Sequence, residues 1–128
     1  MSTRAHIRIE SKDDNEVVFL YHHCDGDPDC VGADLKRFIK RVGKYDWDVY
    51  EIANKILHGE VTSYSFFSKK YDPDLYYELT SDLHGDEDYL YLIDVDSRKL
   101  ICYSYNHDDT YEETIAKNKI IEIPEDKE

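Results

Sequence analysis

The spacing of the apolar residues changes twice along this chain, and these changes limit the folds available to it. Apolar and polar residues alternate over residues 5–10, apolar residues recur at helical spacing between residues 31 and 57, and strand-like patterns return from residue 61. A period of two residues is typical of strands, and a period near 3.6 is typical of helices. The sequence therefore predicts strands, then helices, then strands, which is the order of an α+β domain.

The first 22 residues are predicted to form a β-hairpin. The segment AHIRIE (residues 5–10) alternates, and EVVFLYH (residues 16–22) is rich in β-branched and aromatic residues. The polar segment SKDDN between them is typical of a turn. The continuous apolar run of the second strand indicates that it is covered on both faces and lies inside the sheet.

Two helices are predicted to follow, over residues 28–42 and 47–58, as a helical hairpin. In each helix the apolar residues share one face. They are Val31, Leu35, Phe38, Ile39 and Val42 in the first helix, and Val49, Ile52, Ala53, Ile56 and Leu57 in the second. Asp27 and Asp46 precede these patterns and are expected to cap the two helices.

The rest of the chain is predicted to add a tyrosine-rich antiparallel meander to the same sheet. Its expected strands are residues 61–67, 75–81, 88–95 and 99–106, with an edge strand at 119–123. Leu90 and Leu92 alternate with Tyr91 and Ile93, which indicates a central strand with two buried faces. A chain of 128 residues is expected to form one domain, 1–128, in which the acidic tail 125–128 frays.

The net charge of the chain is −13, from 16 Lys and Arg against 29 Asp and Glu. Because this charge repels phosphate backbones, direct nucleic-acid binding is not expected, whereas a basic protein surface would attract the chain. An odd number of cysteines and an N-terminus without an apolar leader predict a reduced, cytoplasmic protein. The longest wholly apolar run, residues 17–20, is too short to cross a membrane.

The segment YHHCDGDPDCVGADL (residues 21–35) concentrates residue types that bind metals. Zinc could use His22, His23, Cys24 and Cys30, with Cys102 and His107 as further donors. Adjacent histidines on a strand point to opposite faces, and the two cysteines are too far apart for a zinc knuckle, so no zinc site is predicted. A calcium loop starting at Asp25 is excluded because its sixth and twelfth positions hold Cys30 and Lys36 instead of Gly and Glu.

Nucleophilic catalysis by this segment would need Cys30 as a thiolate and His22 or His23 as its base. The neighbouring carboxylates of Asp27 and Asp29 oppose a thiolate electrostatically. A small buried thiol at the start of a helix is the expected role of Cys30.

The preferred interpretation of the segment is a junction between a strand and a capped helix. Its residues are Asp25, Gly26, Asp27, Pro28 and Gly32. Gly26 permits a positive φ, Asp27 caps, and Pro28 occupies the first helical position. Gly32 allows the helix to approach the preceding strand closely. No catalytic residue, metal or cofactor is predicted on this interpretation.

The N-terminal STRAHIRI and the segment after Tyr21 resemble a family of small uncharacterised proteins of phages, prophages and gut-type bacteria. The family pattern reads STRAxI, followed by Y-x-H-x-DGYP-x-G-x-G. The matching residues are Ser2, Thr3, Arg4, Ala5, Tyr21, His23, Asp25, Gly26, Pro28 and Gly32. Asp27 and Cys30 stand where the family has Tyr and Gly. The resemblance covers about the first forty residues and implies accessory or mobile-element biology in a bacterial host.

Charge, size and this resemblance together predict an acidic, phage-type accessory protein that binds and inhibits a host defence or nucleic-acid-processing protein. A CRISPR effector, which has a basic channel, is the concrete partner, so the role is anti-CRISPR-like. The acidic clusters expected to form the interface are Asp86, Glu87, Asp88, Glu112 and Glu113.

Two alternative functions stay open. A small-ligand-binding protein or hydrolase-like enzyme would use His22, His23, Asp25 and Cys30, together with tyrosines of the meander, around one pocket. A homodimeric interaction module would associate through the tyrosine-rich edge of the sheet. Because no convincing catalytic set is found, a function without catalysis is favoured.

Overall fold

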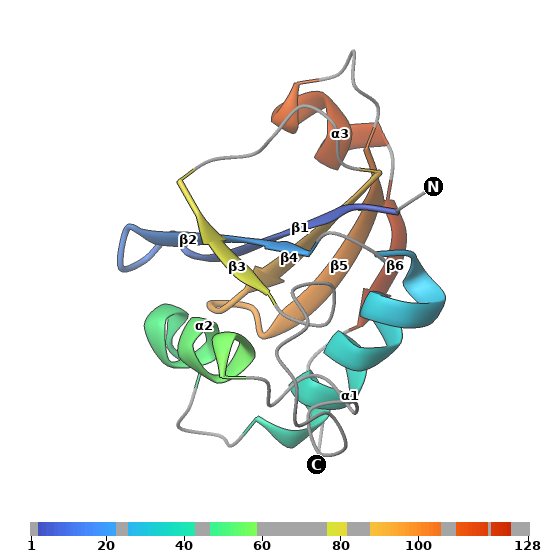
Figure 1. The fold of residues 1–128 in the computed structure, drawn as a ribbon. Helices are drawn as coiled ribbons and strands as arrows, with labels where there is room; N and C mark the ends of the chain where they lie inside the picture. The colour runs from blue at the N-terminus through green and yellow to red at the C-terminus, as the bar shows by residue number, and fades with distance from the viewer. Residues whose placement is uncertain are drawn as a thin grey trace, which may run out of the picture.

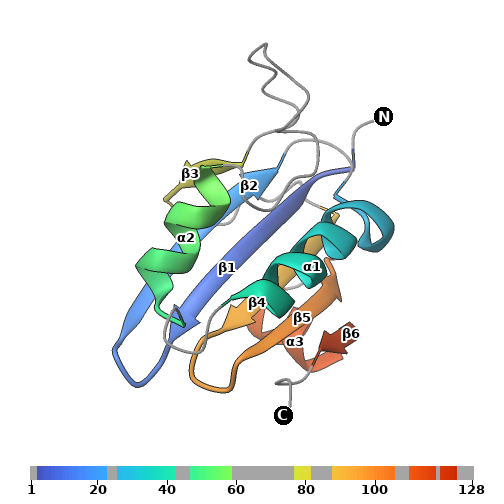
Figure 2. The ribbon, with the colours of Figure 1, turned by 90° about the horizontal axis from the view of Figure 1, so that it is seen from below.

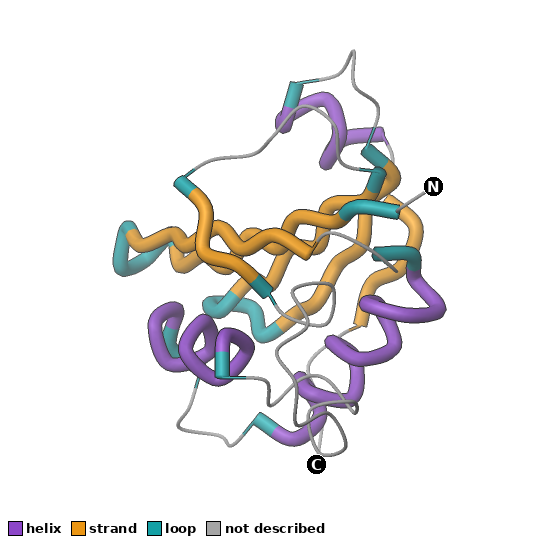
Figure 3. The backbone as a smooth tube through the Cα atoms, viewed as in Figure 1, coloured by secondary structure: helices purple, strands orange, loops and turns teal. Residues whose placement is uncertain are grey.

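A computed structural model describes residues 3–22, 26–42, 47–58, 77–81, 88–105, 110–117 and 119–123. These residues form one six-stranded sheet with helices on both faces, as Figures 1 and 3 show. Two helices, α1 (Ala33–Arg41) and α2 (Val49–Leu57), lie side by side across one face, which we call the α1/α2 face (Figure 2). A shorter helix, α3 (Tyr111–Lys117), covers the other face, which we call the α3 face. The predicted α+β class is confirmed.

The predicted N-terminal hairpin is present. Strands β1 (Ala5–Ser11) and β2 (Glu16–His22) pair antiparallel, from Ala5 opposite His22 to Ser11 opposite Glu16. Alternation along β1 sends Ile7 and Ile9 to the α1/α2 face, where both are fully buried. β2 lies between β1 and β3 (Glu78–Thr80), so its predicted position inside the sheet is also correct.

The sheet is mixed, with the strand order β3-β2-β1-β4-β5-β6. Strands β4 (Tyr89–Asp94), β5 (Lys99–Ser104) and β6 (Lys119–Ile123) form the predicted antiparallel meander, with β6 at the edge. Strand β3 (Glu78–Thr80) does not join this meander, because it pairs with β2 at the opposite edge. β1 and β4 are the parallel neighbours at the centre. The predicted strand at 61–67 lies outside the described residues.

The two predicted helices bury the faces that their periodicity indicates. A π turn, η1 (Pro28–Gly32), precedes α1 (Ala33–Arg41), and α2 spans Val49–Leu57. The buried apolar residues of these elements are Val31, Leu35, Phe38, Ile39, Val49, Ile52, Ala53 and Ile56. The N-cap of α2 is Asp48, whose carboxylate accepts a hydrogen bond from the Glu51 N–H at 3.1 Å. The predicted cap, Asp46, is therefore two residues too early.

Helix α3 (Tyr111–Lys117) was not among the predicted elements, although a local signal for it exists. The Thr110 hydroxyl accepts from the Glu113 N–H at 3.2 Å, and the Glu113 carboxylate accepts from the Thr110 N–H at 3.3 Å. This reciprocal pair is a capping box, which requires Ser or Thr followed three residues later by Glu or Gln. The sequence TYEE therefore marks the start of α3.

The two faces of the sheet bury different sets of side chains. On the α1/α2 face, Tyr91 and Ile93 of β4 join the large core that the two helices cover. On the α3 face, Leu90 and Leu92 of the same strand pack with Tyr103 of β5. The prediction that β4 is a central strand with two buried faces is confirmed.

Candidate functional site

The chain passes from β2 to α1 through a junction that is pressed against the start of β1. The Gly26 N–H donates to the carbonyl oxygen of Thr3 at 2.9 Å. A Cβ at Gly26 would lie 2.8 Å from the Ala5 Cβ and 2.9 Å from the Arg4 carbonyl carbon. Glycine is required here by this close approach. The predicted positive φ at Gly26 is wrong.

Asp27 stands at the N-cap position in an extended conformation, but its side chain makes no capping hydrogen bond. Its backbone carbonyl instead accepts from the Cys30 N–H at 3.0 Å and the Gly32 N–H at 3.3 Å. The second bond spans five residues and makes the first turn a π turn. The predicted capping by the Asp27 side chain is therefore wrong, whereas Pro28 begins the turn as predicted.

Tyr91 of β4 fixes the junction from the sheet side. Its hydroxyl donates to the carbonyl oxygen of Gly26 at 2.7 Å. A Cβ at Gly32 would lie 3.3 Å from this same hydroxyl oxygen. The close approach predicted for Gly32 is thus present, but it is made to β4 and not to the preceding strand, β2.

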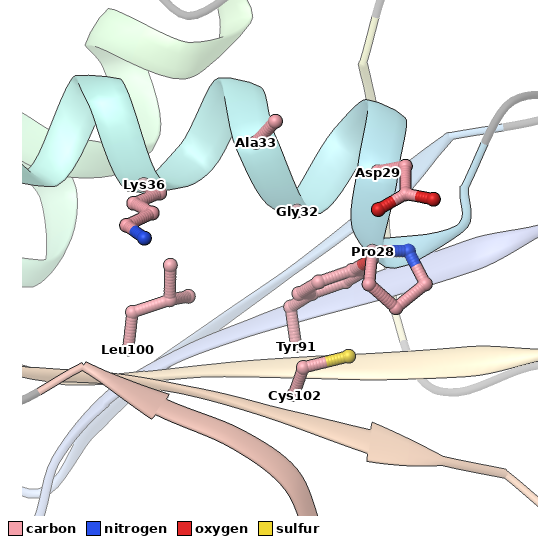
Figure 4. Close-up of a pocket in the computed structure, with 8 residues that line it drawn as sticks. All are labelled: Pro28, Asp29, Gly32, Ala33, Lys36, Tyr91, Leu100 and Cys102. Atoms are coloured by element: carbon pink, nitrogen blue, oxygen red, sulfur yellow. The ribbon is translucent and has the colours of Figure 1, made fainter.

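A cavity of about 280 Å³ lies between the first turns of this helical segment and strands β4 and β5, as Figure 4 shows. The residues that line it are Pro28, Asp29, Gly32, Ala33, Lys36, Tyr91, Leu100 and Cys102. Asp29 and Lys36 are its charged lining residues, and both side chains point from the helix toward the sheet. Within the described chain, neither makes an ion pair or hydrogen bond through its side chain.

The sheet side of the cavity is neutral at physiological pH. Burial raises the pKa of the Cys102 thiol to about 11, although its hydrogen bond with Tyr91 acts in the opposite direction. Burial also raises the pKa of Tyr91, and the neighbouring Cys102 adds to this effect. A protonated thiol is a poor nucleophile, so this arrangement is suited to binding and not to covalent catalysis.

The predicted ligand or pocket residues do not gather around this cavity. His22 is buried, and its ring lies 4.6 Å from that of Tyr77, measured between centroids. Cys30 is exposed on the outer side of the π turn, so the prediction of a buried thiol is wrong, because Val31 takes the inward position. Neither His22 nor Cys30 lines the cavity. His23, Cys24 and Asp25 lie outside the described residues.

No prediction assigned Lys36, Leu100 or Cys102 to this cavity, whereas Tyr91 is one of the meander tyrosines that a ligand-binding protein was expected to use. No local pattern links Cys102 to the junction, because β5 is brought there by the sheet. Among the described residues, no three His, Cys, Asp or Glu side chains gather closely enough to hold a metal ion. No helix within the described ranges is long and apolar enough to cross a membrane.

The predicted acidic interface divides into residues with structural roles and residues without them. The Asp88 carboxylate accepts from the Arg4 N–H at 3.0 Å and ties the start of β4 to β1. Glu113 belongs to the capping box of α3. Glu112 is exposed. Asp86 and Glu87 lie outside the described residues.

The charges of the molecule are segregated. Helix α1 carries Lys36, Arg37, Lys40 and Arg41, all exposed, and one acidic residue, Asp34. Its net charge is therefore +3, and since the whole chain carries −13, the remainder carries −16. Asp34 pairs with Arg37, yet partial burial keeps the pKa of its carboxyl above the usual value.

Three carboxylates lie at the tips of two hairpins, in the same turns as Lys12 and Arg98. The Asp96 carboxylate accepts from the Ser11 hydroxyl at 2.7 Å and the Lys12 N–H at 2.8 Å. These bonds hold the β4–β5 turn against the β1–β2 turn, and they lower the pKa of Asp96. Asp13 and Asp14 project from the same place with exposed side chains. We call Asp13, Asp14 and Asp96 the acidic tip.

Comparison with known proteins gives no match, whether with family models, with curated proteins or with solved structures.

Proposed function

We propose that this protein binds a positively charged surface of another protein, and that in doing so it blocks a nucleic-acid-processing enzyme of a bacterial defence system. The observation that carries the proposal is the segregation of charge. Since α1 holds four of the 16 cations and one of the 29 acidic residues, the rest of the chain has 28 acidic residues and 12 cations. Such an excess accelerates encounter with a basic groove and competes with its polyanionic ligand.

The acidic tip is the best described candidate for the contact surface. The side chains of Asp13 and Asp14 are exposed, and their backbone N–H groups, not their carboxylates, make the local hydrogen bonds. Their charges can therefore be changed without removing a structural bond. Asp88 and Glu113 are less suitable for such a test, because their carboxylates support the fold.

The test measures binding to purified nucleic-acid-processing enzymes with basic channels, including a CRISPR effector, by surface plasmon resonance. Binding should weaken by about tenfold or more between about 50 mM and 300 mM salt, because screening shortens the reach of the charges. In the double variant Asp13→Lys/Asp14→Lys the association rate should fall, and the dissociation rate should change less.

Variants that reverse the side-chain charge of Glu78 or of Arg98 are the controls for this test. Glu78 is exposed on β3 opposite Tyr21, at the end of the sheet far from the acidic tip. Glu78→Lys changes the net charge as much as Asp14→Lys does, so a larger effect of Asp14→Lys locates the contact at the tip. Arg98→Glu beside the tip should leave binding intact or strengthen it. Absence of binding to every such enzyme at low salt would reject the proposed function.

A further inference from the structure

We infer that the cavity beneath the start of α1 binds a small zwitterion of about the size of a dipeptide, at a site separate from the acidic tip. The cavity has a volume of about 280 Å³ and is open to solvent beside the helix (Figure 4). Ligand sites in proteins are typically concave and mostly apolar, with a few polar groups that fix orientation. This cavity has that composition.

The two charged residues supply opposite poles. Asp29 and Lys36 are seven residues apart, so two turns of helix place them on the same side, separated by about 10 Å of helical rise. Both side chains point toward the sheet in Figure 4, and neither has an ion-pair partner within the described residues. A ligand with an amine at one end and a carboxylate at the other would satisfy both residues.

The separation of the poles favours a short zwitterion. An extended dipeptide spans about 7 Å, because each residue adds about 3.3–3.6 Å. With charged hydrogen bonds of about 2.8 Å at each end, the dipeptide covers about 12–13 Å, and the flexible Lys36 side chain takes up the difference from the helical rise. A single amino acid with the same two hydrogen bonds covers about 9 Å and leaves more of the 280 Å³ unfilled.

The middle of the cavity matches an apolar side chain on the ligand. Pro28 and Ala33 line it from the helical segment, and Leu100 lines it from β5. Cys102 is 3% exposed and holds its proton at neutral pH, so it presents a neutral thiol. An aliphatic side chain would therefore contact apolar or neutral groups, whereas a charged one would be left unpaired.

The backbone at the junction leaves this space open. Gly32 lines the cavity, and a Cβ there would lie 3.4 Å from the Tyr91 ring and 3.5 Å from Pro28. The π turn that contains Gly32 is wider than an α-helical turn, and such turns occur frequently at functional sites. The cavity is thus formed by the same π turn and glycine with which the helical segment begins.

Isothermal titration calorimetry with the full chain tests the inference, with the dipeptide alanyl-leucine as the probe. The matched probes are its N-acetyl form, its C-terminal amide and free leucine. Each blocked probe should bind at least about fivefold more weakly than the dipeptide, because each loses one ion pair. Gly32→Ala, whose added methyl group would lie against the lining residues Tyr91 and Pro28, should weaken binding at least about fivefold.

Charge variants make the test specific. In Asp29→Asn, acetylation of the probe should cost nothing further, and in Lys36→Gln, amidation should cost nothing further, since the lost partner is the one each group contacts. Lys40→Gln, one turn beyond and outside the cavity lining, should bind the dipeptide like the parent chain. Circular dichroism checks that each variant is folded.

Three results would overturn the inference. The first is no saturable binding of alanyl-leucine in the millimolar range, and the second is equal affinity of Gly32→Ala and the parent chain for the dipeptide. The third is that acetylation and amidation of the probe weaken its binding equally in Asp29→Asn and in Lys36→Gln.

Discussion

The two faces of the sheet differ in size and in chemistry. Among the described residues, the α1/α2 face has a core of 18 buried apolar residues, whereas the α3 face has a cluster of three. The α3 face also holds Arg8, whose guanidinium lies 4.4 Å from the ring centroid of Tyr111 and 5.2 Å from that of Phe19. Glu10 pairs with Arg8 at 3.2 Å on the same face.

The difference follows from one alternating strand. In β1, Ile7 and Ile9 face the large core, while Arg8 and Glu10 face α3. Hydrophobic burial scales with apolar area, so the α1/α2 face supplies most of the stability. The short helix α3 is held by fewer apolar contacts, by the cation–π contact of Arg8 with Tyr111, and by its capping box. Equivalent substitutions on the two faces should therefore lower the free energy of unfolding by different amounts.

The largest expected difference comes from truncating one aliphatic side chain on each face. Leu35→Ala, at a fully buried site of the large core, should lower the free energy of unfolding by about 3 kcal/mol. Ile115→Ala, at a partly buried site of α3, should cost only about 1 kcal/mol. Urea denaturation measures both values. Equal losses would show that the two faces contribute alike.

A smaller effect should appear as the pH rises, because the α1/α2 face buries a thiol. The pKa of Cys102 is raised from 9.0 to about 11, so the folded state keeps a proton that the unfolded chain releases. The stabilisation that this protonation difference gives the folded state is fully present below pH 9, and about 2 kcal/mol of it is lost by pH 11.

Cys102→Ala tests that assignment. The space left by the missing thiol lowers the free energy of unfolding at every pH. The decline of this free energy that begins near pH 9 should, however, be shallower than in the parent chain. The buried tyrosines continue the decline at higher pH in both proteins, since burial raises the pKa of Tyr111 to about 12. Parallel curves between pH 9 and 10 would contradict the assignment to Cys102.

The smallest effects concern how the helices begin on each face. Thr110→Ala should destabilise α3 by about 1 kcal/mol, because the Glu113 N–H loses its acceptor. Asp27→Ala should change stability by less than about 0.5 kcal/mol, because its carboxylate caps nothing. Hydrogen exchange of the helix amides and thermal melts distinguish these outcomes. Asp48→Ala, which removes a true cap, is the positive control.

The helices and their buried faces could be predicted because their signal is local. Leu35 and Phe38 lie within one segment whose period alone identifies the face that is buried. The position of β3 could not be predicted, since the choice between β2 and β4 as its neighbour depends on contacts far apart in the chain. The capping prediction for Asp27 failed because a π turn directs its backbone carbonyl, not its side chain, to the free N–H groups.

The candidate sites were predictable to a lesser extent. The sequence drew attention to the junction, and its glycines do permit close approaches. The residues that the glycines approach, Ala5 of β1 and Tyr91 of β4, have no local sequence pattern that predicts this contact. The capping box of Thr110 and Glu113 was readable from the sequence, and it explains one acidic residue that charge density alone assigned to an interface.

The parallel pairing of β1 with β4 sets the order in which this protein can be assembled. Ala5 pairs with Tyr89, so the first strand made must wait for a strand 84 residues later. At a synthesis rate of about 5–20 residues per second, that wait lasts about 4–17 seconds. During that interval the edge of β1 that later pairs with β4 has no partner, and Ile7 and Ile9 lack the neighbours that β4 supplies. The emerging hairpin thus presents an unpaired strand edge and an uncovered apolar face, the two features that favour misassembly.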